Sequence, residues 1–141
     1  MINRNILSFI GDIATELSKR NKKWICFGAG GFFAEFIEKY CNKEKILPLP
    51  AYVCDNNQEL WGKVIAGVAV ESPEKMAKEP VEDCVIVISS ALPYSIMSDL
   101  IIKYQKHYYC IITLAQLQTY FFVKKNEQKL KKIQELFEDV K

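Results

Sequence analysis

A glycine-rich turn between a strand-like run and a helical pattern constrains this chain more than any other feature. The apolar run Trp24–Phe27 is typical of a strand, it stops at Gly28-Ala29-Gly30, and helical spacing begins at Gly31. Such a unit can hold phosphate, because Gly28 allows the tight turn and Gly30 lets the backbone come close to the anion. The following helix then directs its first N–H groups and its dipole at the anion. We therefore expect a nucleotide-binding fold.

The pattern departs from the dinucleotide fingerprint G-x-G-x-x-G at its third position. That position is normally small, so that the helix can pack closely on the strand. Here it is Phe33. The turn therefore predicts a nucleotide-binding fold more firmly than it predicts a bound dinucleotide.

Apolar periodicity along the chain alternates between helix and strand. Helices are expected over residues 4–20, from Gly31 to about Asn42, from Pro73 with Ser72 as N-cap, and from Pro93. Strands are expected at Trp24–Phe27, Ala51–Cys54, Val64–Val70 (broken by Gly67), Cys84–Ser89 and Tyr108–Thr113. This alternation predicts an α/β fold, a Rossmann-like doubly wound parallel sheet of about five strands in the order 3-2-1-4-5, with helices at both termini.

Composition excludes several classes of function. With 141 residues, 50% of them hydrophobic, the chain can build one ordinary core, and its net charge of +2 argues against nucleic acid as a partner. No apolar run approaches the roughly 20 residues that cross a bilayer, so no membrane association is expected. The five cysteines form no C-x-x-C pair, and with His107 as the single histidine we expect no metal site. Free thiols in strand-like runs indicate a cytoplasmic protein.

Polar residues that follow the second and fourth expected strands complete a candidate site. Asp55 lies where a carboxylate would accept hydrogen bonds from a ribose, or else it caps an Asx turn with Asn56 beside it. Ser89 and Ser90 end the fourth strand at the crevice where strand order reverses, and Ser90 could instead cap the next helix. The candidate cofactor-binding residues are Gly28, Ala29, Gly30, Gly31, Phe32, Asp55, Asn56, Ser89 and Ser90.

No catalytic constellation stands out. Tyr120 and Lys124 match the Tyr-x-x-x-Lys spacing of short-chain dehydrogenases, but a chain with seven tyrosines and many lysines produces about one such match by chance. We expect no catalytic residue and no activity from this chain alone.

The last stretch carries an apolar stripe that must be buried against something. Its members are Leu130, Ile133, Leu136, Phe137 and Val140. Either the helix folds back on the domain or packs on a partner, a homodimer included, or the chain belongs to a longer protein. The expected organisation is an N-terminal amphipathic helix (1–22), a nucleotide-binding domain (23–120) and a C-terminal amphipathic helix (121–141) that could link to a further domain.

The order of several short motifs resembles one known type of domain. The motifs are Phe27-Gly-Ala-Gly30, Asp55-Asn56, Trp61-Gly62, Gly67-Val-x-Val70 and Ser72-Pro73. This order is similar to the Rossmann-like (NAD- or CoA-binding-like) N-terminal domain of FkbM-type methyltransferases and related sugar-nucleotide and polysaccharide enzymes. The resemblance implies NAD, CoA or a nucleotide-sugar as ligand, and a tail that leads into an S-adenosylmethionine-dependent methyltransferase domain.

Methyl transfer would require a second glycine-rich strand–turn–helix unit, but this sequence contains a single such unit, which the nucleotide-binding domain already uses. The first hypothesis is therefore a nucleotide- or sugar-nucleotide-binding domain that is not catalytic by itself. Two alternatives stay open. One is a small NAD-dependent sugar-nucleotide oxidoreductase or dehydratase, and the other is a degenerate interaction module in which Phe32 and Phe33 fill the former cleft.

Overall fold

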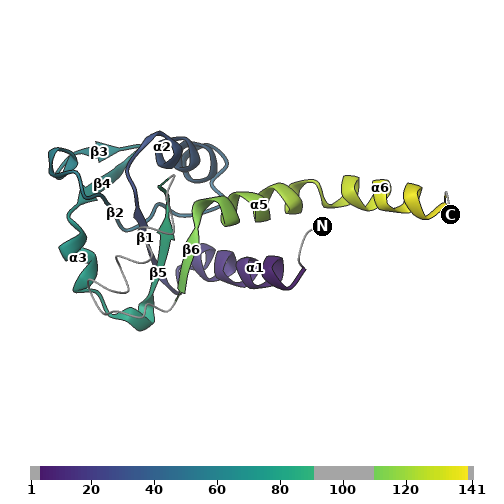
Figure 1. Ribbon diagram of the computed structural model, residues 1–141, viewed down its shortest axis with the longest axis horizontal. Coiled ribbons are helices and arrows are strands. Elements are labelled where there is room, and N and C mark those ends of the chain that lie inside the picture. Colours follow the sequence, from purple (N-terminus) through teal and green to yellow (C-terminus); the bar gives the residue numbers. More distant parts are fainter. Residues whose placement is uncertain (1–3, 91–109, 140–141) are drawn as a thin grey trace.

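The computed structural model describes residues 4–90 and 110–139, and it has helices on both faces of a six-stranded sheet (Figure 1). The helices are α1 (Arg4–Ser18), α2 (Gly31–Ile37), α3 (Pro73–Ala77), α5 (Leu114–Lys125) and α6 (Glu127–Asp139). The strands are β1 (Lys23–Phe27), β2 (Val53–Cys54), β3 (Val64–Ile65), β4 (Val68–Glu71), β5 (Cys84–Ile88) and β6 (Cys110–Thr113). Short helical turns are the π-helical η1 (Glu38–Lys43) and the 3-10 helices η2 (Gln58–Leu60) and η3 (Val81–Asp83).

The strand order is β3-β4-β2-β1-β5-β6. Strands β4, β2, β1, β5 and β6 are parallel neighbours, and β1 pairs with β5 in register from Lys23–Cys84 to Phe27–Ile88. This confirms the doubly wound sheet and the 3-2-1-4-5 order of its parallel strands. The chain reverses direction across the sheet between β1 and β5, which places the topological switch point there.

The sheet has one strand more than expected, because the predicted third strand is a hairpin. Ala66 and Gly67 both have positive φ, 53° and 88°. Positive φ at both central residues is the requirement of a two-residue type I′ turn. β3 therefore runs antiparallel to β4, and Gly67 marks the turn between two strands rather than a break within one.

Alternate side chains of the strands enter two separate cores, one on each face of the sheet. All five residues of β5 are buried, as a central parallel strand requires. One core lies between the sheet and α1, α2 and α5, and it includes Phe33, which is fully buried. The other core contains Met76 of α3.

Helix α1 is an integral part of the domain, because Ile10, Ile13 and Leu17 are buried in the same core as α2 and α5. It packs against α5, and the two lie side by side in Figure 1. A Cβ added to Gly11 would lie 2.9 Å from the ring of Tyr120, so this glycine lets the two helices approach closely.

Helix α5 begins at Leu114, directly after β6, and crosses the boundary expected at residue 120. Thr113 forms a capping box with Gln116, which fixes that start. At Asn126 the helix breaks and α6 continues, extending beyond the rest of the molecule (Figure 1). The helix expected from Pro93, together with Tyr108 and His107, lies outside the described residues.

All five cysteines are free and buried. Burial raises the pKa of the Cys41 and Cys54 thiols to about 12. Within the described ranges, no helix has the length and apolar character to cross a membrane.

Candidate nucleotide-binding crevice

The carboxyl ends of β1, β2 and β5 meet at Gly28, the first residue of the glycine turn. The Gly28 N–H donates to the Cys54 carbonyl of β2 at 2.8 Å, and the Gly28 carbonyl accepts from the Ser89 hydroxyl at 2.6 Å. The turn is therefore fastened on both sides. Ligands of open α/β sheets bind in this crevice, at the carboxyl ends of strands beside the switch point.

Gly28 is required at its position for two reasons. Its φ of +117° lies in a region that residues with a Cβ rarely adopt, and a Cβ there would lie 2.8 Å from the Ser90 backbone nitrogen. The close approach of β1 and the end of β5 thus depends on a residue without a Cβ at position 28. The positive φ is what the tight turn expected at Gly28 requires, and the lack of a side chain also makes room for the protein's own chain at Ser90.

Asp55 joins the end of β2 to the same turn. Its Oδ2 accepts from the Ala29 N–H at 2.9 Å, and its Oδ1 accepts from the Asn57 N–H at 2.9 Å. The second bond is the Asx turn that the sequence offered as an alternative role. Each carboxylate oxygen retains further lone-pair capacity, so a ribose hydroxyl could still donate to Asp55.

The start of α2 is the open part of the turn. Gly30, Gly31 and Phe32 are exposed, and among the described residues no side chain caps the helix at Gly30. A Cβ at Gly30 or Gly31 would meet no atom within 4 Å from the rest of the described structure. The N–H groups of Gly28 and Ala29 are already paired, so a phosphate would be held from Gly30 onward.

The remaining candidates have different surroundings. The Ser89 side chain is buried, and its hydroxyl is directed at Gly28 rather than into the crevice. Ser90 is half-buried beside Gly28, and Asn56 is exposed next to Asp55. Phe33 lies in the core and Phe32 is 40% exposed, so Phe33 does not fill a cleft.

Trp61 is a contributor that sequence reasoning did not include among the site residues. Its indole N–H donates to the Asp55 backbone carbonyl at 2.7 Å, which fixes the loop that carries the carboxylate. The sequence contained a pointer to Trp61, since Trp61-Gly62 follows Asp55-Asn56 among the motifs that carry the resemblance.

Tyr120 and Lys124 lie on α5 and not in the crevice. The Tyr120 ring packs against α1 at Gly11, and the Lys124 ammonium lies 3.8 Å from the Glu127 carboxylate. Across residues 4–90 and 110–139, no three His, Cys, Asp or Glu side chains are grouped so as to hold a metal ion.

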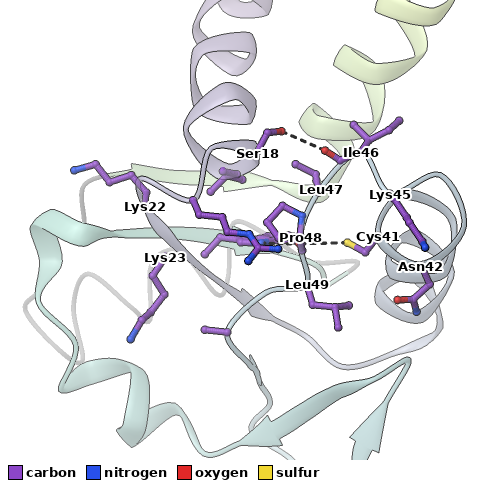
Figure 2. Close-up of a pocket in the computed structure, with 14 residues that line it drawn as sticks. Ser18, Lys22, Lys23, Cys41, Asn42, Lys45, Ile46, Leu47, Pro48 and Leu49 are labelled. Atoms are coloured by element: carbon purple, nitrogen blue, oxygen red, sulfur yellow. Dashed lines mark hydrogen bonds between the residues drawn. The ribbon is translucent and has the colours of Figure 1, made fainter.

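A hollow of about 790 Å³ lies at the amino ends of β1 and β2 (Figure 2). Lysines line it, but Lys23 pairs with Glu79 at 2.7 Å and Lys22 donates to the Glu82 carbonyl at 2.8 Å. Figure 2 shows both side chains pointing to one side and Lys45 on the other. Arg20 also lines this hollow, while Lys22, Lys23 and Lys45 do not converge on one point.

The sequence matches no protein-family model, and no curated protein sequence matches it significantly. Crystal structures of RSP, a Rex-family repressor, share 17% identity with it. One of them aligns over 90% of this chain and 70% of the RSP chain, with a TM-score of 0.46. The complex with β-NADH aligns over 93% of this chain and 72% of the RSP chain, also with a TM-score of 0.46. The complex with β-NAD+ and operator DNA aligns over 91% of this chain and 68% of the RSP chain, with a TM-score of 0.45. The fold assignment rests on strand order and register, and similarity at this level bears on neither ligand nor partner.

Proposed function

We propose that this chain binds a ligand containing a nucleotide, with a phosphate at the start of α2 and a ribose at Asp55. The observation that carries the proposal is the 2.9 Å hydrogen bond between the Ala29 N–H and Asp55, which holds the glycine turn and the carboxylate side by side. Beside them the first turn of α2 is exposed and uncapped. Phosphate recognition by backbone N–H groups and ribose recognition by a carboxylate are the two parts of nucleotide binding in this architecture.

The residues present fit NAD, CoA or a nucleotide-sugar by their chemistry. Gly30 and Gly31 leave space for a diphosphate, because among the described residues no atom outside their own stretch of chain lies within 4 Å of a Cβ built at either position. Asp55 favours an unphosphorylated ribose, since its charge would repel a 2′-phosphate. No step of a reaction is assigned, and the role we propose is binding.

We further propose that the domain serves an FkbM-type methyltransferase or a related polysaccharide enzyme in the cytoplasm. The support is the order of the motifs from the glycine turn to Ser72-Pro73, together with five buried thiols that suit a reducing compartment. Activity toward a sugar substrate is then expected only when a catalytic domain is supplied.

Calorimetric titration of the chain with NAD, CoA and a UDP-sugar tests the binding proposal. The informative variant is Gly30→Asp, because the new side chain enters open space at the N-cap and occupies the N–H groups that a phosphate would use. Folding should be retained or improved by a few tenths of a kcal/mol, while affinity falls at least about tenfold.

A matched control adds the same charge far from the crevice. Asn21→Asp lies in the exposed turn after α1, near the opposite edge of the sheet. This variant should bind as the unchanged chain does. Equal affinity of the Gly30→Asp variant and the unchanged chain would remove the start of α2 from the site, and an absence of heat with all three ligands would contradict the proposal itself.

A further inference from the structure

Helix α6 carries an apolar stripe that nothing in the described part of the chain covers. Leu130, Ile133, Leu136 and Phe137 are 37%, 47%, 65% and 71% exposed. Their spacing of three and four residues places them along one side of the helix. Figure 1 shows α6 extending away from the sheet and its covering helices. A long apolar side in water requires a partner surface.

The charges of α6 are divided between its two halves. The first half, residues 127–132, has three lysines against one glutamate, and the second half, residues 133–139, has acidic residues as its only charges. The charged members are Glu127, Lys129, Lys131, Lys132, Glu135, Glu138 and Asp139. A second helix of the same sequence is therefore complementary when it runs antiparallel, and it is repelled at both ends when it runs parallel.

We propose that α6 is a self-association surface that pairs with α6 of a second copy in antiparallel orientation. A two-fold axis near Glu135 sets Ile133 of one copy against Phe137 of the other, and the reverse. Leu130, Ile133 and Phe137 occupy successive a and d positions of a heptad pattern, and Leu136 flanks them. Each basic half then lies along an acidic half.

A groove at the base of α6 fits the end of the second helix. It has a volume of about 600 Å³ and lies between α1, α5 and α6, with Leu7, Val123 and Leu130 as its apolar lining. Lys124 and Lys131 lie at the same groove. In the antiparallel pair, the acidic end of the second α6 lies beside Lys131, while Lys124 lies about one to two helical turns farther along and pairs with Glu127 of its own chain.

The interface is small, so we expect a weak dimer. Thirteen helical residues span about 20 Å at 1.5 Å each. Two such helices bury less than the roughly 1,200 Å² of a standard stable interface. The dimer should therefore be reversible, with a dissociation constant on the order of 10–100 µM.

Sedimentation equilibrium of the chain from about 10 µM to about 1 mM covers this range. The unchanged chain should shift from monomer to dimer, and Ile133→Asp should remain monomeric with unchanged helix content by circular dichroism. Val64→Asp is the matched control, since Val64 is 69% exposed on β3 and away from α6 (Figure 1). This variant should dimerise as before. A chain that stays monomeric throughout, or dimers that tolerate Ile133→Asp, would overturn the proposal.

Charge reversal tests the orientation. Changing Lys129, Lys131 and Lys132 together to glutamate should weaken the dimer at least about tenfold, because acidic residues then face acidic residues at both ends. Changing Glu135, Glu138 and Asp139 to lysine as well, in the same chain, should restore it. If the first set leaves the affinity unchanged, the helices do not pair in antiparallel orientation.

Discussion

Replacement of Gly28 by alanine should destabilise the domain more than any comparable change in the glycine turn. Two costs add at this position. The backbone φ of +117° is unfavourable for any residue with a Cβ, and the new methyl would lie 2.8 Å from the Ser90 nitrogen and 3.0 Å from the Ser89 carbonyl carbon. Both neighbours are backbone atoms at the end of a central strand, so they cannot rotate away as a flexible side chain would.

The magnitude follows from these two terms. A non-glycine residue held in an unfavourable region costs about 1–3 kcal/mol. Overpacking by one methyl against a rigid neighbour costs about 1–3 kcal/mol more. Gly28→Ala should therefore lower the free energy of unfolding by about 2–6 kcal/mol, a large part of the roughly 5–15 kcal/mol that a domain has. At about 3–4 °C per kcal/mol, the melting temperature should fall by about 6–24 °C.

Gly30→Ala is the control, since it makes the same chemical change two residues away. There φ is −91° and a Cβ meets no atom of the other described residues within 4 Å, so the free energy of unfolding should be unchanged or higher by a few tenths of a kcal/mol. Urea denaturation followed by circular dichroism measures both variants against the unchanged chain. Similar losses in the two variants, or a loss below about 1 kcal/mol for Gly28→Ala, would refute the reasoning from backbone geometry.

Three further changes probe the same crevice and the cores. Ser89→Ala removes the hydroxyl that donates to the Gly28 carbonyl. Urea denaturation should then show a free energy of unfolding lower by about 1–3 kcal/mol, and no change would mean that water replaces the bond. Asp55→Ala should lower the free energy of unfolding by about 1.5–3 kcal/mol, mainly through the part-buried bond to the Ala29 N–H, since the bond to Asn57 is exposed. It should also abolish ribose-dependent affinity in calorimetry, whereas unchanged affinity would remove the carboxylate from the site. Burial raises the pKa of Cys41 and Cys54 from 9.0 to about 12, so these thiols stay protonated in the fold while they ionise in the unfolded chain. Their contribution to the free energy of unfolding is therefore complete below pH 9.0 and is lost as the pH rises from there toward about 12. Cys54→Val should reduce the difference in the free energy of unfolding between pH 8 and about 10.5. An unaltered difference would contradict the assignment.

The arrangement of the parallel strands could be predicted because each strand has a local signal. Cys84–Ile88 is a continuous β-branched run that suits burial on both faces, and the structure buries all five residues. The hairpin at Ala66 could not be predicted in the same way. Alanine carries no turn signal, and its φ of 53° arises from the pairing of β3 with β4 and from the neighbouring Gly67.

The candidate site was predictable in position but not in its internal bonding. The order of glycine turn, Asp55 and Ser89 along the chain follows from the parallel sheet, since carboxyl ends of parallel strands share one edge. Which groups are already paired depends on contacts between distant residues. The bond from Ser89 to the Gly28 carbonyl joins residues 61 positions apart, and no local pattern predicts it. The bond to Ala29 likewise gives Asp55 a structural role beside the one expected.

The most direct test of the proposed function is to follow the backbone amide resonances of the ¹⁵N-labelled chain during titration with NAD, CoA and a UDP-sugar. We expect saturable shifts at the Gly30, Gly31 and Phe32 amides with at least one ligand, accompanied by shifts at Asp55. Unshifted amides at the start of α2 with all three ligands, or shifts confined to the hollow around Pro48 and Lys45, would contradict it.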